Sequence, residues 1–269
     1  MNPLFSIITV TLNPGRADLA KTVNSILVQN YHDWELIIKD GGSVDNSLSV
    51  VPVDNRIKTI KQPDSGIFDA MNQAIKMALG KYICLLNAGD CFFETTALNA
   101  VAAVHIKYPN VDFLYGNVHK PGSRSGYEIY PSRLSRYFLF TSMICHQAWF
   151  VRKEYYIAAG GYETKCTTGG DYRYFLQMNL RDKVEYKRVP QVLIEYKGGG
   201  VSQDPQHIRN SRMWRDDARR LYFLESEIIV YSVIQNVTSL IKKLLYDPFL
   251  FRMWAFFQRK RIKSRRRNG

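Results

Sequence analysis

The sequence has few of the features that mark secreted or membrane-spanning proteins. Its four cysteines (Cys84, Cys91, Cys145 and Cys166) form no Cys-x-x-Cys pair and no cluster. This spacing argues against a disulfide framework or a zinc site and favours a reducing cytosol. Met1–Val10 has no basic segment before its apolar run and no small-residue cleavage site, so we expect a first strand there and not a signal peptide.

Two further absences narrow the function. A G-x-G-x-x-G motif is missing, so a dinucleotide-dependent oxidoreductase lacks its main support. In the C-terminal part the longest uncharged run, Ile228–Ile241, is shorter than the ~20 apolar residues that a membrane-spanning helix needs. Hydrophobic residues make up 46% and aromatic residues 13% of the 269 residues. This composition excludes a disordered chain and allows one large domain, or one domain with an appendage.

Positive charge is concentrated at the C-terminal end. The net charge is +13, and residues 205–269 hold 15 Lys/Arg against 5 Asp/Glu, or +10, which leaves +3 for the first 204 residues. The basic run Gln258–Gly269 directly follows an apolar, aromatic segment, Phe249–Phe257. Aromatic side chains beside Lys and Arg suit the headgroup region of a bilayer, so we expect attachment to an anionic membrane surface. Packing within an oligomer or against a domain is the first alternative, and nucleic-acid binding, which we do not expect, is the second.

The N-terminal part alternates strand-like and helix-like segments. The predicted strands are Phe5–Thr11, Trp34–Lys39, Ile57–Lys61, Tyr82–Leu86 and Asp112–Tyr115. The predicted helices are Asp18–Gln29 (capped by Asp18), Ile67–Leu79 (ended by Gly80) and about Thr95–Lys107. This rhythm predicts an α/β fold with an open, mostly parallel sheet covered by helices.

Polar residues collect where three of these strands end. The three strand ends read Thr11-Leu12-Asn13, Asp40-Gly41-Gly42-Ser43 and Asn87-Ala88-Gly89-Asp90. Ligands of parallel sheets bind at the carboxyl ends of the strands, and these side chains suit a nucleotide with a metal-bound diphosphate. Each segment on its own is also explained by an ordinary turn.

Three more segments hold candidate polar residues. In QPDSGIFDAMNQ, Asp64 lies in a turn, while Asp69 and Asn72 share one face of the following helix; exposed polar positions of a capped helix are the alternative. Later in the chain come His146-Gln147 and Gly169-Gly170-Asp171. A lone histidine is often structural, and Asp171 at the start of a helix can be a simple N-cap.

Six segments in this order resemble the family 2 glycosyltransferases, which have a GT-A fold. They are SIITVTLN, KDGGSVDNS, QPDSGIFDAMNQ, LLNAGD, CHQAWF and GGDYRYFLQ. The resemblance covers about Phe5–Ser202 and is closest in style to bacterial enzymes that build colanic acid and O-antigen repeat units. It includes Lys197–Ser202 (KGGGVS), which resembles the glycine-rich segment that closes the family's domain.

The resemblance implies a role for each candidate residue. Binding of the nucleotide and its sugar falls to Thr11, Asn13, Asp40, Asp64, Asp69 and Asn72, with Asp40 on the base, usually uracil. His146 and Gln147 match the pair that lies near the donor sugar and the acceptor. Asp171 matches the general base, and Asp90 matches the aspartate that binds the metal, expected to be Mn²⁺ or Mg²⁺.

The metal motif departs from the family pattern at one position. The fuller motif reads Asp-x-Asp, whereas this chain has Asn87 and then Gly89-Asp90. Hard cations accept phosphate and water oxygens as readily as carboxylates. We therefore expect weak metal binding, with most ligands supplied by the diphosphate and water.

These observations predict an inverting glycosyltransferase with a GT-A domain over residues 1–202 and a helical, basic, membrane-associating segment over residues 203–269. One base opposite the leaving group predicts a single displacement with inversion. The expected donor is a UDP-hexose, with galactose or glucose favoured by family habit. The expected acceptor is a polyprenyl-diphosphate-linked glycan of surface polysaccharide synthesis, at the cytoplasmic face of the cell membrane.

Two other functions remain open from the sequence. A sugar nucleotidyltransferase has a related sheet, but it would be expected to carry a glycine-rich, Arg-containing phosphate loop after the first strand. Asn13-Pro14-Gly15-Arg16 only faintly resembles such a loop. A non-enzymatic adaptor that binds membranes or nucleic acid through the basic end is the other alternative.

Overall fold

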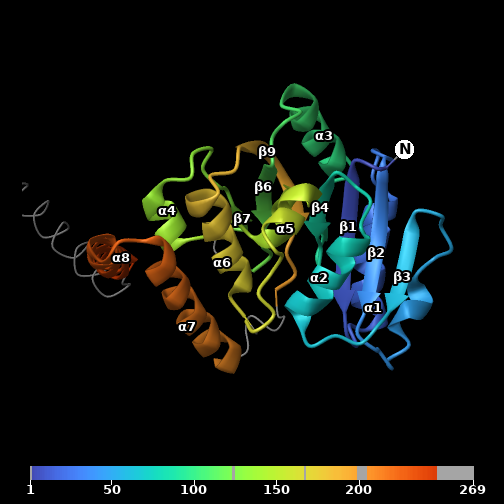
Figure 1. The fold of residues 1–269 in the computed structure, drawn as a ribbon, viewed down its shortest axis with the longest axis horizontal. Coiled ribbons are helices and arrows are strands. Elements are labelled where there is room, and N and C mark those ends of the chain that lie inside the picture. The colour runs from blue at the N-terminus through green and yellow to red at the C-terminus, as the bar shows by residue number, and fades with distance from the viewer. Residues whose placement is uncertain (1, 123–124, 167, 199–204, 247–269) are drawn as a thin grey trace, which may run out of the picture.

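The computed structural model describes residues 2–122, 125–166, 168–198 and 205–246, and these form a nine-stranded sheet with helices packed against it (Figure 1). The strands are β1 (Phe5–Thr11), β2 (Trp34–Asp40), β3 (Ile57–Lys61), β4 (Tyr82–Leu85), β5 (Cys91–Phe92), β6 (Phe113–His119), β7 (Tyr127–Glu128), β8 (Trp149–Arg152) and β9 (Tyr186–Glu195). The helices are α1 (Arg16–Leu27), α2 (Ile67–Met77), α3 (Ala97–Lys107), α4 (Arg136–Thr141), α5 (Lys153–Ala158), α6 (Gly170–Leu176), α7 (Pro205–Tyr222) and α8 (Glu225–Tyr246). Shorter helical turns are η1 (Ser47–Val50), η2 (His146–Ala148) and η3 (Gln177–Arg181).

The N-terminal half forms the predicted parallel sheet. β3, β2, β1 and β4 lie side by side in that order, and all three of their pairings are parallel. Every residue of β1 and β4 is buried, as expected for strands covered on both faces. The predicted strands and helices of this half are confirmed, with ends that differ by a few residues at most.

The C-terminal half makes the sheet mixed. β8 pairs antiparallel with both β4 and β6, whereas β6 and β9 pair parallel to each other. β5 is antiparallel to β9 at one edge. The direction of a strand depends on the connections before and after it, and an apolar run has the same pattern in either direction. The sequence pattern therefore did not reveal β8 as an antiparallel strand. The resulting architecture is the predicted GT-A-like α/β fold.

Two predicted helix ends are wrong. α1 begins at Arg16 with Gly15 as its N-cap, so Asp18 lies inside the first turn and is not the cap. α2 ends at Met77, so Gly80 is not its C-terminal glycine. Gly80 is required for a different reason, because a Cβ atom there would come within 2.5 Å of the Ser6 backbone nitrogen on β1.

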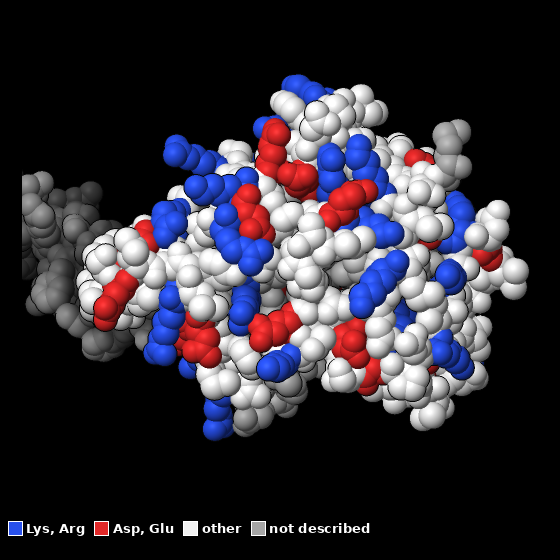
Figure 2. Space-filling view, in the orientation of Figure 1, with Lys and Arg blue, Asp and Glu red and all other residues white. Residues whose placement is uncertain are grey.

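The C-terminal helices continue from the body at the end opposite β3 (Figure 1). α7 packs against α6, and α8 contacts α4 and α7. The predicted domain boundary at residue 202 and the basic run Gln258–Gly269 lie outside the described residues. Within the described parts, no helix has the length and apolar character to cross a membrane. On the face shown in Figure 2, Lys/Arg and Asp/Glu side chains are interspersed over the body.

All four cysteines are free thiols. Cys84, which the sequence places in the core, is fully buried within β4. Cys91 is also buried, and burial raises the pKa of its thiol. The Cys91 thiolate, which nucleophilic chemistry would need, is therefore disfavoured.

Candidate active site

The polar ends of β1, β2 and β4 lie at the same edge of the sheet. Thr11 and Asp40 are register partners at the ends of β1 and β2. Leu86, just after β4, donates its backbone N–H to the Ile8 carbonyl of β1, so the following turn Asn87–Asp90 leaves the sheet at the same edge. The predicted meeting of three strand ends is confirmed.

Asp40 and Asn13 organise the loops that follow β1 and β2. Asp40 is fully buried and accepts hydrogen bonds from the backbone N–H groups of Gly42 and Ser43 and from the Ser43 hydroxyl. Asn13 accepts from the Val44 N–H at 2.9 Å, and its own N–H donates to Ser43 Oγ at 2.8 Å. These bonds hold the two loops together beside the strand ends.

Thr11 presents a hydroxyl that protein groups leave unused. Its Oγ1 is buried and has no hydrogen-bond partner among the residues that the structure describes. A buried hydroxyl without a partner is costly, and one at a strand end is placed to bond a ligand. This observation supports the predicted contact between Thr11 and the nucleotide-sugar donor.

We expect Thr11→Val to weaken donor binding without loss of stability. The substitution removes a hydroxyl that makes no bond to protein and keeps the shape, so the melting temperature should not fall. The donor KM should rise about fivefold to tenfold, the usual worth of one neutral hydrogen bond. Donor KM and thermal unfolding of both proteins measure the two effects.

Thr22→Val is the matched control for Thr11→Val. Thr22 Oγ1 accepts from the Gly89 N–H at 2.9 Å and donates to the Asp90 carbonyl at 2.7 Å, so its loss should lower the melting temperature. A stability loss in Thr11→Val as large as in Thr22→Val would show that the Thr11 hydroxyl serves the fold.

Asp64 lies against the β2 loop and pairs with a buried lysine. Lys39 Nζ is 2.6 Å from Asp64 Oδ2, and the Lys39 side chain is 0% exposed. A Cβ atom on Gly41 would lie 2.9 Å from Asp64 Oδ2, which places this carboxylate beside the loop that follows Asp40. The sequence contained a signal for Lys39 that we missed, because a lysine inside a buried strand needs a partner.

Asp69 and Asn72 bind different parts of the protein. Asp69 Oδ2 accepts from the Ser65 N–H at 2.8 Å and from Gln73 Nε2 at 3.1 Å, so it holds the turn before α2. Asn72 uses both ends of its amide on the backbone of Tyr162, each at 2.8 Å. Their predicted contacts with the donor stay predictions.

We expect Asn72→Ala to act mainly on stability. The alanine leaves the N–H and the carbonyl of Tyr162 without these partners, and each lost bond to a half-buried group costs about 1–3 kcal/mol. Urea unfolding measures this loss, and donor KM is measured beside it. An unchanged unfolding midpoint with a raised donor KM would assign Asn72 to the donor instead.

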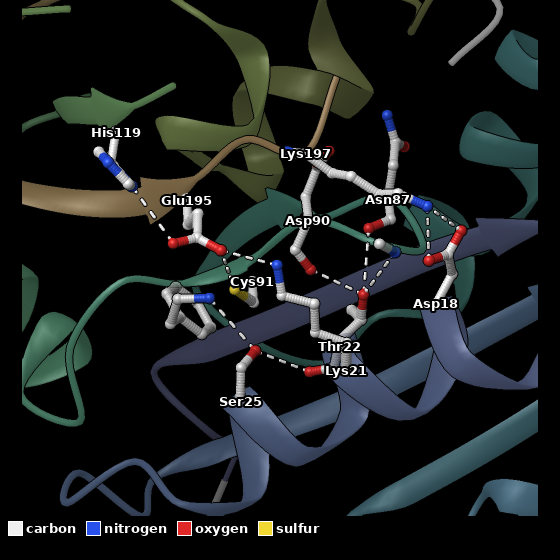
Figure 3. A network of polar contacts seen from close by, with 12 residues as sticks. Asp18, Lys21, Thr22, Ser25, Asn87, Asp90, Cys91, His119, Glu195 and Lys197 are labelled. Atoms are coloured by element: carbon white, nitrogen blue, oxygen red, sulfur yellow. Dashed lines mark hydrogen bonds and ion pairs between the residues drawn. The ribbon is translucent and has the colours of Figure 1, made fainter. Parts of the chain in front are cut away.

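Asp90 is buried at the turn after β4, and groups from two other segments bond to its carboxylate. Figure 3 shows Asp90 beside Lys197, which supplies one of these groups. Asp90 is 5% exposed. Its Oδ1 accepts from the Lys197 backbone N–H at 2.9 Å, and its Oδ2 accepts from Gln147 Nε2 at 2.8 Å. Burial raises the pKa of Asp90, and these two N–H groups act in the opposite direction.

Lys197 fastens the end of β9 to α1 across the Asp90 turn. Its Nζ is 2.6 Å from both carboxylate oxygens of Asp18 (Figure 3), and its side-chain stem lies against Gly89. A Cβ on Gly89 would lie 2.8 Å from Lys197 Cδ, and Gly89 has a φ of +95°. Both facts require glycine at this position. Beside it, Glu195 of β9 pairs with Lys21 of α1 at 2.7 Å.

The residues around Asp90 fit a divalent cation that is held mainly by its ligand. Each Asp90 oxygen accepts one N–H group, and a carboxylate oxygen has further acceptor capacity. No group of three or more His, Cys, Asp or Glu side chains is placed for a metal within the described ranges. Phosphate and water oxygens would therefore have to complete the coordination, which hard cations accept.

The His146-Gln147 dipeptide connects Asp90 to Asp171. Gln147 bonds to Asp90, while the neighbouring His146 places Nδ1 3.3 Å from Asp171 Oδ2. The other ring nitrogen of His146, Nε2, is 3.5 Å from the Asn87 amide. One short segment, η2, therefore fixes the position of both carboxylates.

Asp171 lies in the first turn of α6 and not at the N-cap, which is Gly169. The simple N-cap alternative is therefore wrong. Asp171 is 23% exposed on its side chain, so a substrate can reach it. Burial alone would raise the pKa of Asp171, but the hydrogen bond and charge of His146 and the N–H of Tyr172 outweigh it, and the pKa lies below its ordinary value. The group is thus an ionised, accessible carboxylate.

Comparison with known sequences finds relatives of this chain. The family model described as "Glycosyl transferase family 2" matches residues 6–160. A "PGL/p-HBAD biosynthesis glycosyltransferase" from Mycobacterium tuberculosis is 33% identical over 208 residues, which cover 74% of this chain and 79% of the relative. A chondroitin synthase from Pasteurella multocida is 30% identical over 193 residues, which cover 68% of this chain and 20% of that enzyme.

Structure comparisons support the same fold at low sequence identity. S. aureus TarS 1-349 in complex with UDP-GlcNAc has a TM-score of 0.62 and 14% identity, over 84% of this chain and 68% of that chain. The mannosyltransferase PcManGT from Pyrobaculum calidifontis, in complex with GDP-Man and Mn2+, has a TM-score of 0.56 and 14% identity, over 96% of this chain and 84% of that chain.

Proposed function

The chain belongs to glycosyl transferase family 2, and from that premise we propose that it transfers a hexose from a UDP-sugar to a lipid-diphosphate-linked glycan with inversion. It is a glycosyltransferase of polysaccharide or glycolipid biosynthesis. The choice of UDP draws on TarS, whose structures hold UDP and UDP-GlcNAc. Galactose and glucose remain the proposed sugars, and O-antigen, capsule or colanic acid the proposed products.

The observation that carries the proposal is the link between Asp90 and Asp171 through His146-Gln147. Sugar transfer needs one group at the departing diphosphate and another at the attacking hydroxyl, a fixed distance apart. A rigid dipeptide bonded to both carboxylates supplies that spacing. A protein that merely binds nucleotides does not require an ionised, accessible carboxylate at the second position.

In the proposed mechanism Asp171 is the base. An acceptor hydroxyl is a weak nucleophile until it loses its proton, and the Asp171 carboxylate accepts that proton as the oxygen attacks the anomeric carbon. His146 orients Asp171 and holds it ionised. The bond to the nucleoside diphosphate breaks in the same step, so an α-linked donor gives a β-glycoside.

The nucleotide is proposed to bind across the ends of β1 and β2. Asp40 accepts from the base, Thr11 and Asn13 contact the donor beside it, and Asp64 and Asp69 line the sugar-phosphate side. Asp90 would hold Mn²⁺ or Mg²⁺, which when bound neutralises negative charge on the leaving diphosphate. Mn²⁺ in the PcManGT structure supports this choice of cofactor.

We also propose a cytoplasmic enzyme attached to the inner face of the cell membrane by its C-terminal segment. The support is the charge of residues 205–269 and the aromatic run Phe249–Phe257 before the basic end. Removal of Gln258–Gly269 should reduce binding to anionic vesicles. If vesicle binding stays unchanged and RNA binding disappears, the adaptor alternative replaces this part of the proposal.

A screen of nucleotide sugars tests the proposed activity. Each sugar is incubated with Mn²⁺ or Mg²⁺, with and without a synthetic lipid-diphosphate acceptor, and the release of nucleoside diphosphate is measured. We expect one UDP-hexose to be consumed, and faster with acceptor. Exchange of labelled pyrophosphate into a nucleotide sugar, without release of nucleoside diphosphate, would instead support the nucleotidyltransferase alternative.

A further inference from the structure

α8 carries a continuous apolar stripe that nothing in the described structure covers. The stripe consists of seven aliphatic side chains, each between 40% and 60% exposed. They are Ile229, Val230, Val233, Ile234, Val237, Leu240 and Ile241. Isolated apolar side chains are common on surfaces, whereas an apolar stripe along three turns of one helix marks an interaction surface.

The stripe and the body contact lie on different faces of α8. At 100° per residue the seven side chains fall within an arc of about 140°. Ile228 and Tyr231, which pack against the core, fall outside that arc. Between Ile228 and Ile241 the remaining positions hold uncharged polar residues, namely Ser232, Gln235, Asn236, Thr238 and Ser239. α8 therefore has two apolar faces. A short one packs against the body, and the longer stripe faces outward.

The first turns of α8 are fixed firmly to the body. Tyr231 contacts the rings of Phe140 and Tyr137 with centroids 5.5 and 5.6 Å apart. Glu227 pairs with Arg136 at 2.6 Å. In Figure 1, α8 lies at the end of the molecule farthest from β3, and in Figure 2 its visible surface is mostly uncharged. The stripe is thus presented at a fixed orientation relative to the active site.

We propose that the α8 stripe lies on the surface of an anionic lipid bilayer, with the helix parallel to the membrane plane. The charge of the residues after α8 favours a membrane over other partners of the stripe. Residues 247–269, which follow α8 directly, hold eight Lys/Arg against one Asp. An uncharged apolar stripe followed by a dense cationic run matches the acyl boundary and the anionic headgroups of one membrane surface.

A parallel pair of copies of this chain fits the stripe less well. Two copies packed in parallel along α8 would bring two cationic ends together, which electrostatic repulsion opposes. The inference rests on the membrane attachment proposed above and adds the surface that makes the contact. It also orients the enzyme, because α8 is fixed to α4 and α7.

Co-sedimentation of the full chain with vesicles tests the proposal. Vesicles are made of phosphatidylcholine alone or mixed with phosphatidylglycerol. The variant Val233→Ser/Val237→Ser should lower the partition coefficient for the mixed vesicles by about tenfold or more, because two exposed apolar side chains lose their burial in lipid. The control Gln235→Ser/Asn236→Ser changes only the polar face and should bind as the wild type does.

Two further measurements keep the result unambiguous. Amide hydrogen exchange of the wild-type chain should slow over residues 229–241 when mixed vesicles are added, which does not depend on any variant folding. Hydrolysis of the nucleotide sugar without vesicles should be equal in all variants. A variant that keeps hydrolysis and loses vesicle binding supports the contact of the stripe with lipid, even if the acceptor proves different. If the wild type hydrolyses no nucleotide sugar but binds vesicles through the stripe, only the proposed function is contradicted.

Other outcomes would overturn the inference. Vesicle binding by Val233→Ser/Val237→Ser equal to that of the wild type, with no change in hydrogen exchange over α8, would exclude the stripe as the lipid contact. A dimeric wild type that becomes monomeric in this variant, with vesicle binding retained, would assign the stripe to a second copy. Binding of RNA and not of vesicles would exclude the membrane altogether.

Discussion

Replacing Asp171 by Asn is expected to lower kcat by about 10²–10⁴-fold, the usual contribution of a general base, while the donor Kd changes by less than about twofold. Asparagine fills the same space beside His146 and Tyr172 but cannot accept the acceptor proton. Transfer is measured by product formation and donor binding by calorimetry. Full turnover by Asp171→Asn would refute the base assignment.

Asp112→Asn is the matched control for Asp171→Asn. Asp112 likewise lies beside a basic residue, with Arg152 at 3.5 Å, but it lies just before β6 and away from the strand ends that form the site. Its kcat should match that of the wild type. A loss of activity in both variants would indicate a general effect of removing a paired carboxylate.

The pH profile gives a second test of Asp171. Its pKa lies below the ordinary carboxyl value because His146 and the Tyr172 N–H outweigh burial. The carboxylate is therefore already ionised at neutral pH, and protonation removes the base only at pH values below the ordinary carboxyl range, about 4. We expect Asp171 to add no acid limb to kcat between about pH 6 and pH 8.

Replacing Asp90 by Asn is expected to lower kcat/KM by about 10²–10³-fold, since a metal at the leaving group supplies several kcal/mol of charge stabilisation. Asparagine keeps the size of the side chain and one acceptor for the two N–H donors, Gln147 Nε2 and the Lys197 backbone. Asp90→Ala removes both acceptors and should also weaken metal-dependent donor binding. Donor affinity measured over a range of Mn²⁺ concentrations separates the metal effect from the rest.

Thr22→Val is the control for structural damage at the Asp90 turn. It removes the Thr22 hydroxyl bonds to the Gly89 N–H and the Asp90 carbonyl and leaves the Asp90 carboxylate in place, so metal-dependent donor binding should persist although the melting temperature falls. Equal donor affinity with and without Mn²⁺ in the wild type, and no effect of Asp90→Asn, would contradict a metal role for Asp90.

The fold of the N-terminal half could be predicted from sequence because its strands are short segments rich in apolar or β-branched residues between polar turns. Phe5–Thr11 and Ile57–Lys61 have the predicted bounds. Helix ends were harder, since Gly15 and not Asp18 is the N-cap of α1, and Gly80 is required by the nearby backbone of β1 and not by a helix end. The direction of β8 depends on how the chain returns to the sheet, which no local pattern records.

The candidate site was predictable as a set of residues but not as a network. Turns after buried strands identified Asp40 and Asp90. Nothing in the spacing of His146 and Asp171 shows that their side chains meet, because the 24 residues between them include β8 and α5. The cation over the Asp90 turn, Lys197, comes from a segment more than 100 residues away, and its contact with Asp18 depends on the tertiary fold alone.

The most direct measurement of the central claim is the product of a single reaction with the donor found by the screen. The new glycosidic bond is examined by NMR, and the nucleoside diphosphate is counted. We expect one equivalent of nucleoside diphosphate per glycoside, with the anomeric configuration opposite to that of the donor. A glycoside that retains the donor configuration, or a donor consumed without any nucleoside diphosphate, would contradict single displacement by a base at Asp171.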